Sequence, residues 1–545
     1  MNRNRVIVIG LDGASYPQVN KWIEQGDLPT LARMKARGCA GKLLATIPCV
    51  SASSLCAMTT GQNSGKTGVF DFSKLDGSVY SFRELKQQTI WEILGDMGKK
   101  VLIAGVENTF PPKSVNGVLI GGFPLLSDEE DYTYPKELKK DTRGFHLPPS
   151  EYRELMSAWD SKDFEKIYEL VEAQLNRQEK IFFNLQKKHD YDFTMLWLAA
   201  TDTIQHYCWE REDLVLKIFQ KIDKLIATIL ASYPSADLLV VSDHGFEVMP
   251  SFQIHLNNFL IDEGYLILRG NWFRRMLIYL ANVFAENKVA IWLRASSLRA
   301  RRKNIKRINV PSHIQRQVLA KPLIPGLDRK KSVAYLAQRW GINLIKENLG
   351  GRYDQTRDEI IAKLKNLKDT VDNPLIRFVK KREELYAGPY LEQIPDIIFI
   401  SETGYIPSKF LRVRFSSKLF YFISIFLGNR LTTLFFQFFG VATQNLSQAV
   451  VTKIRGKKKF AAYHEMAIDG IFFAYGPNFQ EHNSLGTISM LDIAPSILAH
   501  FGVEAPHEMD GKIIENLFKQ RPNISSSKNR YFRGEMETIL EGLDI

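Results

Sequence analysis

The sequence predicts an α/β fold in which a central, mostly parallel sheet carries helices on both faces and inserted segments form a cap or lid. Three observations predict it. The first half of the chain alternates short apolar runs with amphipathic helical stretches, which is typical of strands joined by crossover helices. Acidic and histidine residues follow several of the apolar runs. Two basic, aromatic segments interrupt the alternation before it resumes toward the C-terminus.

The expected elements follow in chain order. RVIVIGL (5–11) reads as a buried strand, and residues 28–37 read as a helix closed by Gly38, because glycine often ends a helix. KVLIAGV (100–106) and GVLIGGF (117–123) read as further strands, and a long helical region runs from about 150 to 188. Four later runs extend the strand pattern: DFTMLWLAATD (192–202), ADLLVVSDHGF (236–246), IPDIIFIS (394–401) and DGIFFAYGP (469–477).

Length and composition indicate a large globular protein. A chain of 545 residues can form one large domain with insertions or two to three domains. The 72 Lys and Arg against 60 Asp and Glu give a net charge of +12, which favours anionic partners such as phosphate esters, nucleic acid or anionic membrane. The 4 cysteines match neither a disulfide framework nor a CxxC zinc site. No secretory signal or long apolar run is recognised, so a cytoplasmic location is expected, with peripheral membrane association left open.

The glycine-rich stretch TTGQNSGKTG (59–68) looks similar to a phosphate-binding loop. A P-loop needs its first glycine at position 60, five residues before Gly65, but the chain has Thr60 there, and Gly61 comes one residue late. The preceding SSLCAMTT (53–60) reads as a helix rather than as a buried strand. The spacing therefore does not favour a nucleotide-binding loop.

Residues that can bind metals gather at the predicted strand ends. The candidates are Asp12, Asp202, His206, Asp243, His244 and His464. If TDTIQHYCW (201–209) starts a helix, Asp202 and His206 share one face, because residues four apart are neighbours on a helix. Open α/β sheets bind ligands at the carboxyl ends of their strands. Six carboxylate and imidazole groups meeting there suggest two divalent metal ions rather than one.

Each candidate also has a purely structural interpretation. An aspartate such as Asp12 after a strand can cap a helix, and a DxxxH pair can be a solvated pair on a helix surface. The segment SDHG (242–245) can be a simple turn, and His464 can be a packed or surface histidine. The joint occurrence of these residues at successive strand ends favours metal binding.

These segments resemble the alkaline phosphatase superfamily, and within it the type I phosphodiesterase/nucleotide pyrophosphatase family. The matching phrases are VIGLDGASYPQVNKWIEQGDLPTLARMKARG (8–38), ATIPCVSASSLCAMTTGQNSGKTGVFDF (45–72), AATDTIQHYCW (199–209), VVSDHGF (240–246), AYHEMAIDGIFFAYGP (462–477) and SMLDIAPSILAHFGVEAPHEMDGK (489–512). The matches cover both ends and most of the middle of the chain. The resemblance implies an alkaline-phosphatase-like fold and hydrolysis of phosphodiester or pyrophosphate bonds.

The resemblance also implies residue roles. Ser51 in TIPCVSAS (46–53) corresponds to the nucleophile that forms a phosphoserine intermediate, with Ser53 and Ser54 as neighbouring competitors. Two divalent metal ions, zinc in this family, are implied. The ligands implied for the ion that activates the nucleophile are Asp12, Ser51, Asp243 and His244. The ligands implied for the ion that holds the attacking water are Asp202, His206 and His464.

The substrate stays open. Thr67 stands where many relatives have His, and GVFDF (68–72) lacks the Asn with which nucleotide-cleaving members contact a phosphoryl oxygen. A nucleotide and a lipid-linked ester are both candidates. The alternative functions are a phosphomonoesterase, a phosphotransferase, or a membrane-surface binding protein with a vestigial site. A sulfatase is not favoured, because its CxPxR motif needs Pro and Arg where this chain has Ser51 and Ser53.

The two inserts set the expected domain boundaries. The expected parts are a catalytic core (1–268), a basic helical cap (269–389), a core strand (390–403), an aromatic basic insert (404–458), the last part of the core (459–520) and a tail (521–545). The basic, aromatic stretches around 271–308 and 408–440 can be a packed cap or a surface that contacts an anionic bilayer. Nucleic acid is not favoured, because no RRM, KH or helix-turn-helix pattern accompanies the charge. The oligomeric state is not predicted.

Overall fold

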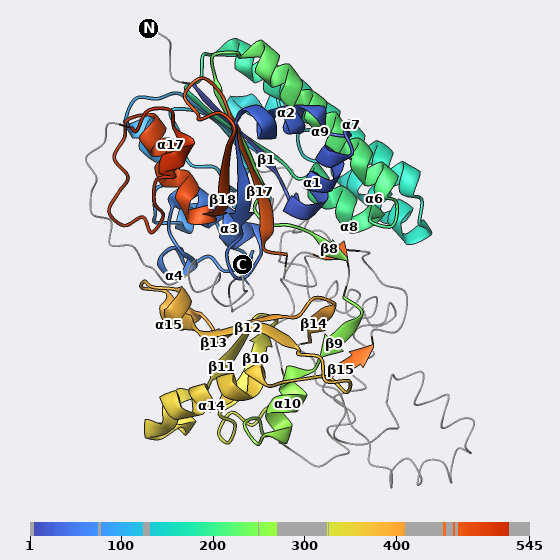
Figure 1. Ribbon diagram of the computed structural model, residues 1–545, viewed down its shortest axis with the longest axis vertical. Helices are drawn as coiled ribbons and strands as arrows, with labels where there is room; N and C mark the ends of the chain where they lie inside the picture. Colours follow the sequence, from blue (N-terminus) through green and yellow to red (C-terminus); the bar gives the residue numbers. More distant parts are fainter. Residues whose placement is uncertain are drawn as a thin grey trace, which may run out of the picture.

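The main sheet of the protein has nine strands. The computed structural model describes residues 5–72, 74, 78–123, 131–248, 250–269, 324, 326–408, 451–453, 462–463 and 467–522. In spatial order the strands are β18 (Asn483–Ser489), β2 (Cys39–Leu44), β17 (Asp469–Tyr475), β7 (Asp237–Val241), β1 (Val6–Leu11), β6 (Phe193–Leu198), β3 (Val101–Ala104), β4 (Gly117–Ile120) and β5 (Thr133–Tyr134). The sheet is drawn edge-on in the upper half of Figure 1.

Most neighbours in this sheet are parallel. Strand β1 lies between β6 and β7, with Val6 opposite Phe193 on one side and Asp237 on the other. Strand β17 is antiparallel to both β7 and β2, so β2 runs in the same direction as β1. The carboxyl ends of β1, β2, β3, β6 and β7 therefore meet at one edge. Strand β17 begins at that edge, where Asp469 pairs with Leu44.

Helices cover both faces of the sheet, as predicted. One face carries α1 (Tyr16–Glu24), α2 (Pro29–Arg37), α6 (Pro149–Ser161), α7 (Phe164–Lys188), α8 (Ala200–Cys208) and α9 (Glu212–Ser232). The other carries α3 (Ser51–Thr60), α5 (Ile90–Asp96) and α17 (Ile493–His500). Alternate residues of β1 enter the two cores, Ile7 and Ile9 on one side and Val6 and Val8 on the other. This double burial explains the continuous apolar run of the strand.

A second, smaller sheet follows in the chain. Its strands are β10 (Ala334–Gln338), β11 (Gly341–Leu344), β13 (Ile397–Ser401) and β12 (Ile376–Lys381), all antiparallel, and α14 (Tyr353–Lys365) packs against them. The segment 390–403 was expected in the core sheet, but its strand β13 pairs with β11 and β12. A short apolar run such as IIFIS specifies a buried strand and not its partners, which is why the sequence misassigned it.

The segment expected as a helical cap also differs. In the described part of 269–389, from residue 326 on, three strands accompany α14 and the short helix α15 (Arg382–Leu385). Residues 271–308 lie outside the described residues, as do 409–440, so the membrane-contact interpretation stays a prediction. The remaining described elements are α10 (Leu256–Asp262), a three-stranded sheet of β14 (Tyr405–Pro407), β9 (Phe252–Ile254) and β15 (Val451–Lys453), and a β8 (Glu247–Val248) and β16 (Ala462–Tyr463) pair. No helix in the described ranges has the length and apolar character that a membrane span requires.

The glycine-rich stretch connects helix α3 to a short helix, α4 (Ser64–Thr67). Helix α3 ends at Gly61 in the left-handed conformation (φ 64°), and α4 follows. The amide of Gly65 donates to Asn63 Oδ1 at 2.8 Å, and the amides of Lys66 and Thr67 donate to the Asn63 carbonyl. These amides are therefore engaged within the loop, so the P-loop alternative is wrong and the predicted helix end is confirmed.

The same stretch connects two distant segments to helix α3. Asp510 accepts hydrogen bonds from the Asn63 amide N–H and side chain at 2.9 and 2.8 Å and pairs with Lys66 at 2.6 Å. Tyr390 donates its amide to the Gly65 carbonyl, and a Cβ at Gly65 would lie 2.7 Å from the Ala387 carbonyl. Apolar side chains next to the main sheet and on the second sheet also pack in one core cluster. The second sheet is thus fixed beside the edge where the strand ends meet (Figure 1).

Candidate active site

The carboxyl edge of the main sheet collects residues from four strands. Asp12 follows β1 directly, and Asp243 and His244 follow β7 after Ser242. Asp202 lies in the first turn of α8, which begins two residues after β6 ends. Ser51 is the first residue of α3 and follows β2 by seven residues. Because β2, β7, β1 and β6 run in the same direction, all of these residues arrive at the same edge.

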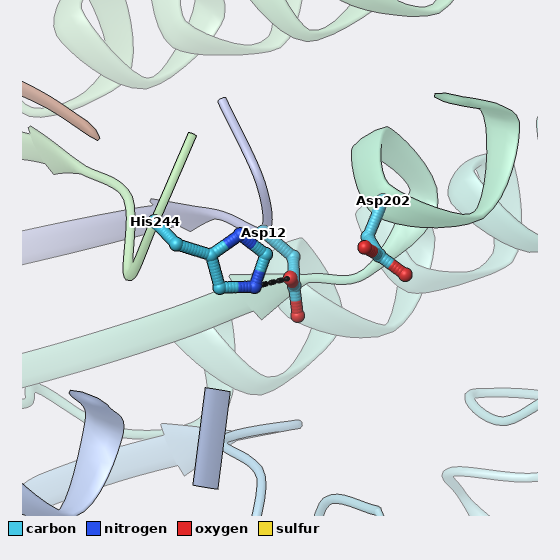
Figure 2. Close-up of side chains that lie close together, drawn as sticks. All are labelled: Asp12, Asp202 and His244. Atoms are coloured by element: carbon cyan, nitrogen blue, oxygen red, sulfur yellow. Dashed lines mark ion pairs between the residues drawn. The ribbon is translucent and has the colours of Figure 1, made fainter. Parts of the chain in front are cut away.

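Three of these side chains form a compact group. Potential ligand atoms of Asp12, Asp202 and His244 all lie within 4.8 Å of one another. Figure 2 shows them arriving from three separate segments, with a dashed line from the His244 ring to the Asp12 carboxylate. His244 Nε2 is 3.6 Å from Asp12 Oδ1 and 3.3 Å from Asp243 Oδ2. Such a set of oxygen and imidazole donors, two of them buried and Asp202 partly exposed, fits a divalent metal ion.

Ser51 lies against this group. Its Oγ is 3.2 Å from His244 Nε2. The competing serines point elsewhere: Ser53 Oγ donates to the Pro48 carbonyl at 2.9 Å, and Ser54 Oγ is hydrogen-bonded to Thr46 Oγ1 at 3.1 Å. Of the three serines, therefore, it is Ser51 whose hydroxyl touches a metal-ligand candidate in the described part of the chain.

The second candidate group is centred on α8. His206 Nε2 is 3.3 Å from Asp202 Oδ1, so the predicted sharing of one helix face is confirmed. The His206 ring packs edge-on against Phe246, with ring centroids 4.8 Å apart. His464 lies outside the described residues. Tyr463, which precedes it, pairs with Glu247, three residues beyond His244, so the chain reaches the neighbourhood of the site just before His464.

Hydrogen bonds from surrounding groups orient the candidate ligands. Trp197 Nε1 donates to Asp12 Oδ2 at 3.0 Å, and the Gly13 amide donates to Asp243 Oδ1 at 3.1 Å. His244 Nδ1 is 2.9 Å from the Gly245 carbonyl, which can only accept, so Nδ1 carries the proton and Nε2 is left with a lone pair. This arrangement of a histidine held through its far nitrogen is typical of metal ligands.

Burial perturbs the acid–base behaviour of the group. Burial and then Asp243, Glu107 and Asp202 raise the pKa of Asp12 well above its usual value. Burial also raises the pKa of Asp243 to about 7. The pKa of Asp202 is raised as well, by burial and by the charge of Asp243. Burial lowers the pKa of His244 to about 4, so its imidazole is neutral at pH 7 and can act as a ligand.

The carboxyl groups lack a compensating cation among the described residues. Asp12 Oδ1, Asp202 Oδ1 and Asp243 Oδ2 are buried and accept no hydrogen bond from any described residue. Like charges in a buried site disfavour one another's ionisation. A bound divalent cation would supply both the missing contacts and the missing charge, so the residues present fit a metal site.

Sequence reasoning missed one member of the group, Glu107. It follows β3, whose carboxyl end lies at the same edge beside β6. Its Oε2 is buried, and its pKa is raised by burial and then by Asp243 and Asp202. The signal was available, because an acidic residue shortly after the apolar run KVLIAGV follows the same pattern as the other strand ends.

Comparison with known proteins decides the family. A protein-family profile described as type I phosphodiesterase / nucleotide pyrophosphatase matches residues 6–411. The chain belongs to this family. As a type I phosphodiesterase/nucleotide pyrophosphatase family member it is a phosphoric ester hydrolase, and the family is metal-dependent and acts on phosphate-ester and nucleotide substrates. No curated protein matches the chain by sequence.

Two solved structures are similar to this family member. Human ectonucleotide pyrophosphatase / phosphodiesterase 5 is 12% identical, with a TM-score of 0.47, over 95% of this chain and 100% of the other. The murine protein is 12% identical, with a TM-score of 0.45, over 92% of this chain and 96% of the other.

Proposed function

We propose that this hydrolase cleaves a phosphodiester or pyrophosphate bond through a phosphoserine at Ser51, beside a site for two divalent metal ions, most simply zinc. The observation that carries the proposal is the 3.2 Å contact of Ser51 Oγ with His244 Nε2, beside the carboxylates of Asp12 and Asp202. A serine hydroxyl in water is a weak nucleophile, whereas one beside a cation site can be activated.

The family resemblance gives the proposed ligand sets, and the distances among the described members support them. One ion would be held by Asp12, Ser51, Asp243 and His244, and the other by Asp202, His206 and His464. When bound, such ions favour the serine alkoxide and neutralise charge on the phosphoryl oxygens. The oxygen and nitrogen donors suit zinc, and other first-row divalent ions use the same donors.

The residues of the chain supply the rest of the chemistry. The Ser51 Oγ–P bond forms as the bond from phosphorus to the leaving alcohol or phosphate oxygen breaks, and the proton that Ser51 gives up is balanced by the one that the leaving oxygen takes up. Water then forms a bond to phosphorus as the Ser51 Oγ–P bond breaks, and one water proton goes to Ser51 Oγ, which returns the free serine. Ser51 is the first residue of α3, a helix of 10 residues, and the unpaired amides of a helix N-terminus favour the negative charge that develops there.

The nucleophile is tested by matched serine variants. Ser51→Ala should abolish turnover of bis-p-nitrophenyl phosphate and leave metal bound, measured by plasma mass spectrometry. Ser53→Ala is the control, because the Ser53 hydroxyl is hydrogen-bonded to the Pro48 carbonyl. This variant should leave turnover unchanged. Acid-quenched wild-type enzyme should carry a phosphoryl group on the peptide with Ser51. Unchanged turnover in Ser51→Ala would move the nucleophile elsewhere.

The class of ester is tested by comparing substrates. Rates on bis-p-nitrophenyl phosphate and p-nitrophenyl phosphate separate a phosphodiesterase from a phosphomonoesterase, and transfer to an added alcohol identifies a phosphotransferase. The basic, aromatic stretches around 271–308 and 408–440 are proposed to contact anionic lipid, which suits a lipid-linked ester. Flotation with vesicles containing phosphatidylserine, against neutral vesicles, tests that contact.

A further inference from the structure

The side chain of Phe246 packs beside both candidate metal groups. Phe246 comes two residues after His244, on the segment that follows β7, and it is buried, with 4% of its surface exposed. Its ring centroid lies 4.8 Å from that of His206, with the two ring planes at 75°. Trp209, at the end of α8, stacks on the Phe246 ring at 24° and 5.8 Å. A residue of the β7 segment therefore contacts the histidine that α8 contributes.

The end of β1 leaves room for this ring. A Cβ at Gly13 would lie 2.8 Å from Cδ2 of Phe246 and 3.4 Å from Cε1 of His244. Gly13 also has a φ of 67°, in the left-handed region that favours glycine. Because Gly13 follows Asp12 directly, the Phe246 ring packs against the end of β1 as well as against α8. Segments from both candidate metal groups thus fix its position.

The backbone and the imidazole ring of His206 are held by different contacts. Two hydrogen bonds tie helix α8 to the end of β1, from Thr201 Oγ1 to the Asp12 carbonyl at 2.7 Å and from Gln205 Nε2 to the Gly13 carbonyl at 3.0 Å. These bonds place the helix and not the ring. The torsion about the Cβ–Cγ bond of histidine has a broad, roughly two-fold preference, so the orientation of the ring depends on the groups that pack against it.

The orientation of the His206 ring matters because its Nε2 faces the other candidate ligand on α8. This nitrogen lies 3.3 Å from Asp202 Oδ1, and a turn of the ring would take it away from the place where one ion could contact both atoms. His244 is oriented differently, because its Nδ1 is held by the Gly245 carbonyl at 2.9 Å. Removal of the Phe246 ring should therefore disturb the His206 group and leave the His244 group in place.

We propose that Phe246 is a positioning residue for the second metal ion: its ring holds the His206 imidazole with Nε2 directed at the ion that Asp202 also binds. This inference rests on the proposed two-ion site. Substitution of an outer group that orients a metal ligand typically lowers the affinity for the metal about 10- to 100-fold. The loss on removal of the Phe246 ring is therefore expected in the affinity for one of the two ions.

The test is a titration of metal-free protein with Zn²⁺ in competition with a chelating dye. Phe246→Leu should bind one ion as wild type does and the other about 10- to 100-fold more weakly. Phe246→Tyr keeps the ring and should restore most of the affinity. Phe219→Leu is the matched control, because Phe219 on α9 is also buried and packs on the Trp22 ring at a centroid distance of 4.9 Å. This control should melt at a lower temperature and bind both ions as wild type does.

A second readout reports the geometry of the site directly. The visible absorption bands of protein loaded with Co²⁺ depend on the arrangement of the metal ligands, so Phe246→Leu should change the bands of the more weakly bound equivalent alone. If Phe246→Leu does not fold, Trp209→Leu removes the ring that stacks on Phe246. This variant should weaken the binding of the same ion by a smaller factor.

Wild-type affinity for both ions in Phe246→Leu, or in Trp209→Leu where the first variant does not fold, would overturn the role of Phe246. An equal loss of affinity for both ions would overturn it as well. Because neither readout needs turnover, a selective loss of one ion in a protein that cleaves no diester would support the role of Phe246 and overturn the proposed function instead. A wild type that binds a single ion would refute the two-ion site, and this inference with it.

Discussion

Metal removal leaves the active site with buried carboxyl groups that repel one another, and this should make the metal-free protein lose stability as pH rises. Burial raises the pKa of Asp243 to about 7, and burial with neighbouring carboxylates raises those of Asp12 and Asp202. An acid whose pKa is raised in the folded state keeps its proton where the unfolded chain has lost it. Stability is therefore present at low pH and falls as pH rises through the folded pKa.

His244 works in the opposite direction over a lower range. Burial lowers its pKa from the ordinary 6.5 to about 4, so the unfolded chain binds the extra proton between these values. His244 therefore increases the stability of the folded state as pH rises to about 6.5, and above that pH its contribution no longer changes. From about pH 6.5 to 8.5 only the carboxyl groups still change the stability. Each carboxyl that stays protonated in the folded state there lowers the free energy of unfolding by about 1.4 kcal/mol per pH unit.

The variant Asp243→Asn gives the magnitude. A pKa raised from 3.8 to about 7 corresponds to at most about 4 kcal/mol of destabilisation at pH 8. The Asn amide oxygen can still accept the Gly13 amide at the place of Asp243 Oδ1, so the variant removes the charge and retains that hydrogen bond. For a chain of 545 residues this is a rise of at most about 4 °C in the melting temperature of the metal-free protein.

The assay is thermal unfolding at three pH values between about 6.5 and 8.5, with chelator and after metal is restored. In the metal-free state Asp243→Asn should melt above wild type at pH 8, whereas in the metal-loaded state it should melt below, because it has lost a proposed ligand. Asp492→Asn is the control, since burial raises the pKa of Asp492 to about 6 away from the metal ligands. Its effect should be equal with and without metal. A metal-free wild type whose stability stays constant or rises above pH 6.5 would refute the reasoning.

Three further outcomes are expected. Trp197→Phe removes the hydrogen bond to Asp12 Oδ2 and should weaken metal binding about 10- to 100-fold in a competition titration with a chelating dye; unchanged affinity would make that contact structural only. Asp510→Ala leaves the Asn63 donors unpaired and should lower the free energy of unfolding by about 1–3 kcal/mol in urea, with metal content unchanged; an unaltered midpoint would contradict the role of Asp510 as the anchor of the loop. His464→Ala should lower bound metal by about one equivalent if two ions are held, and retention of both would remove it as a ligand.

The sequence identified the site because parallel strands make distant residues coincide. Apolar runs that end in Asp12, Asp202 or Asp243 specify only that each acid follows a strand. Once the strands are parallel neighbours, their carboxyl ends lie at one edge, and β1 lies between β6 and β7 in the structure. The same logic extends to Glu107 after β3, which the sequence reasoning overlooked because no family motif marked it.

The sequence did not predict which strands pair with one another. The run IIFIS has the same apolar character in a central position of a small antiparallel sheet as in a large parallel one, so β13 was assigned to the wrong sheet. Strand β17 enters the main sheet in the antiparallel direction, which its apolar residues also leave unspecified. The direction of a strand depends on how the chain reaches it, and β17 follows β14, β15 and β16, which belong to other sheets.

The similarity of TTGQNSGKTG to a phosphate-binding loop has a physical origin. In both cases glycines let another group approach the backbone closely, but here that group is protein: the Ala387 carbonyl beside Gly65 and the Asp510 carboxylate beside Lys66. The loop amides that would bind phosphate are already donated to Asn63. Composition alone therefore identifies a site of close approach and not the approaching group. In this chain the close contact holds helix α3, and with it Ser51, between the second sheet and the C-terminal segment of the core.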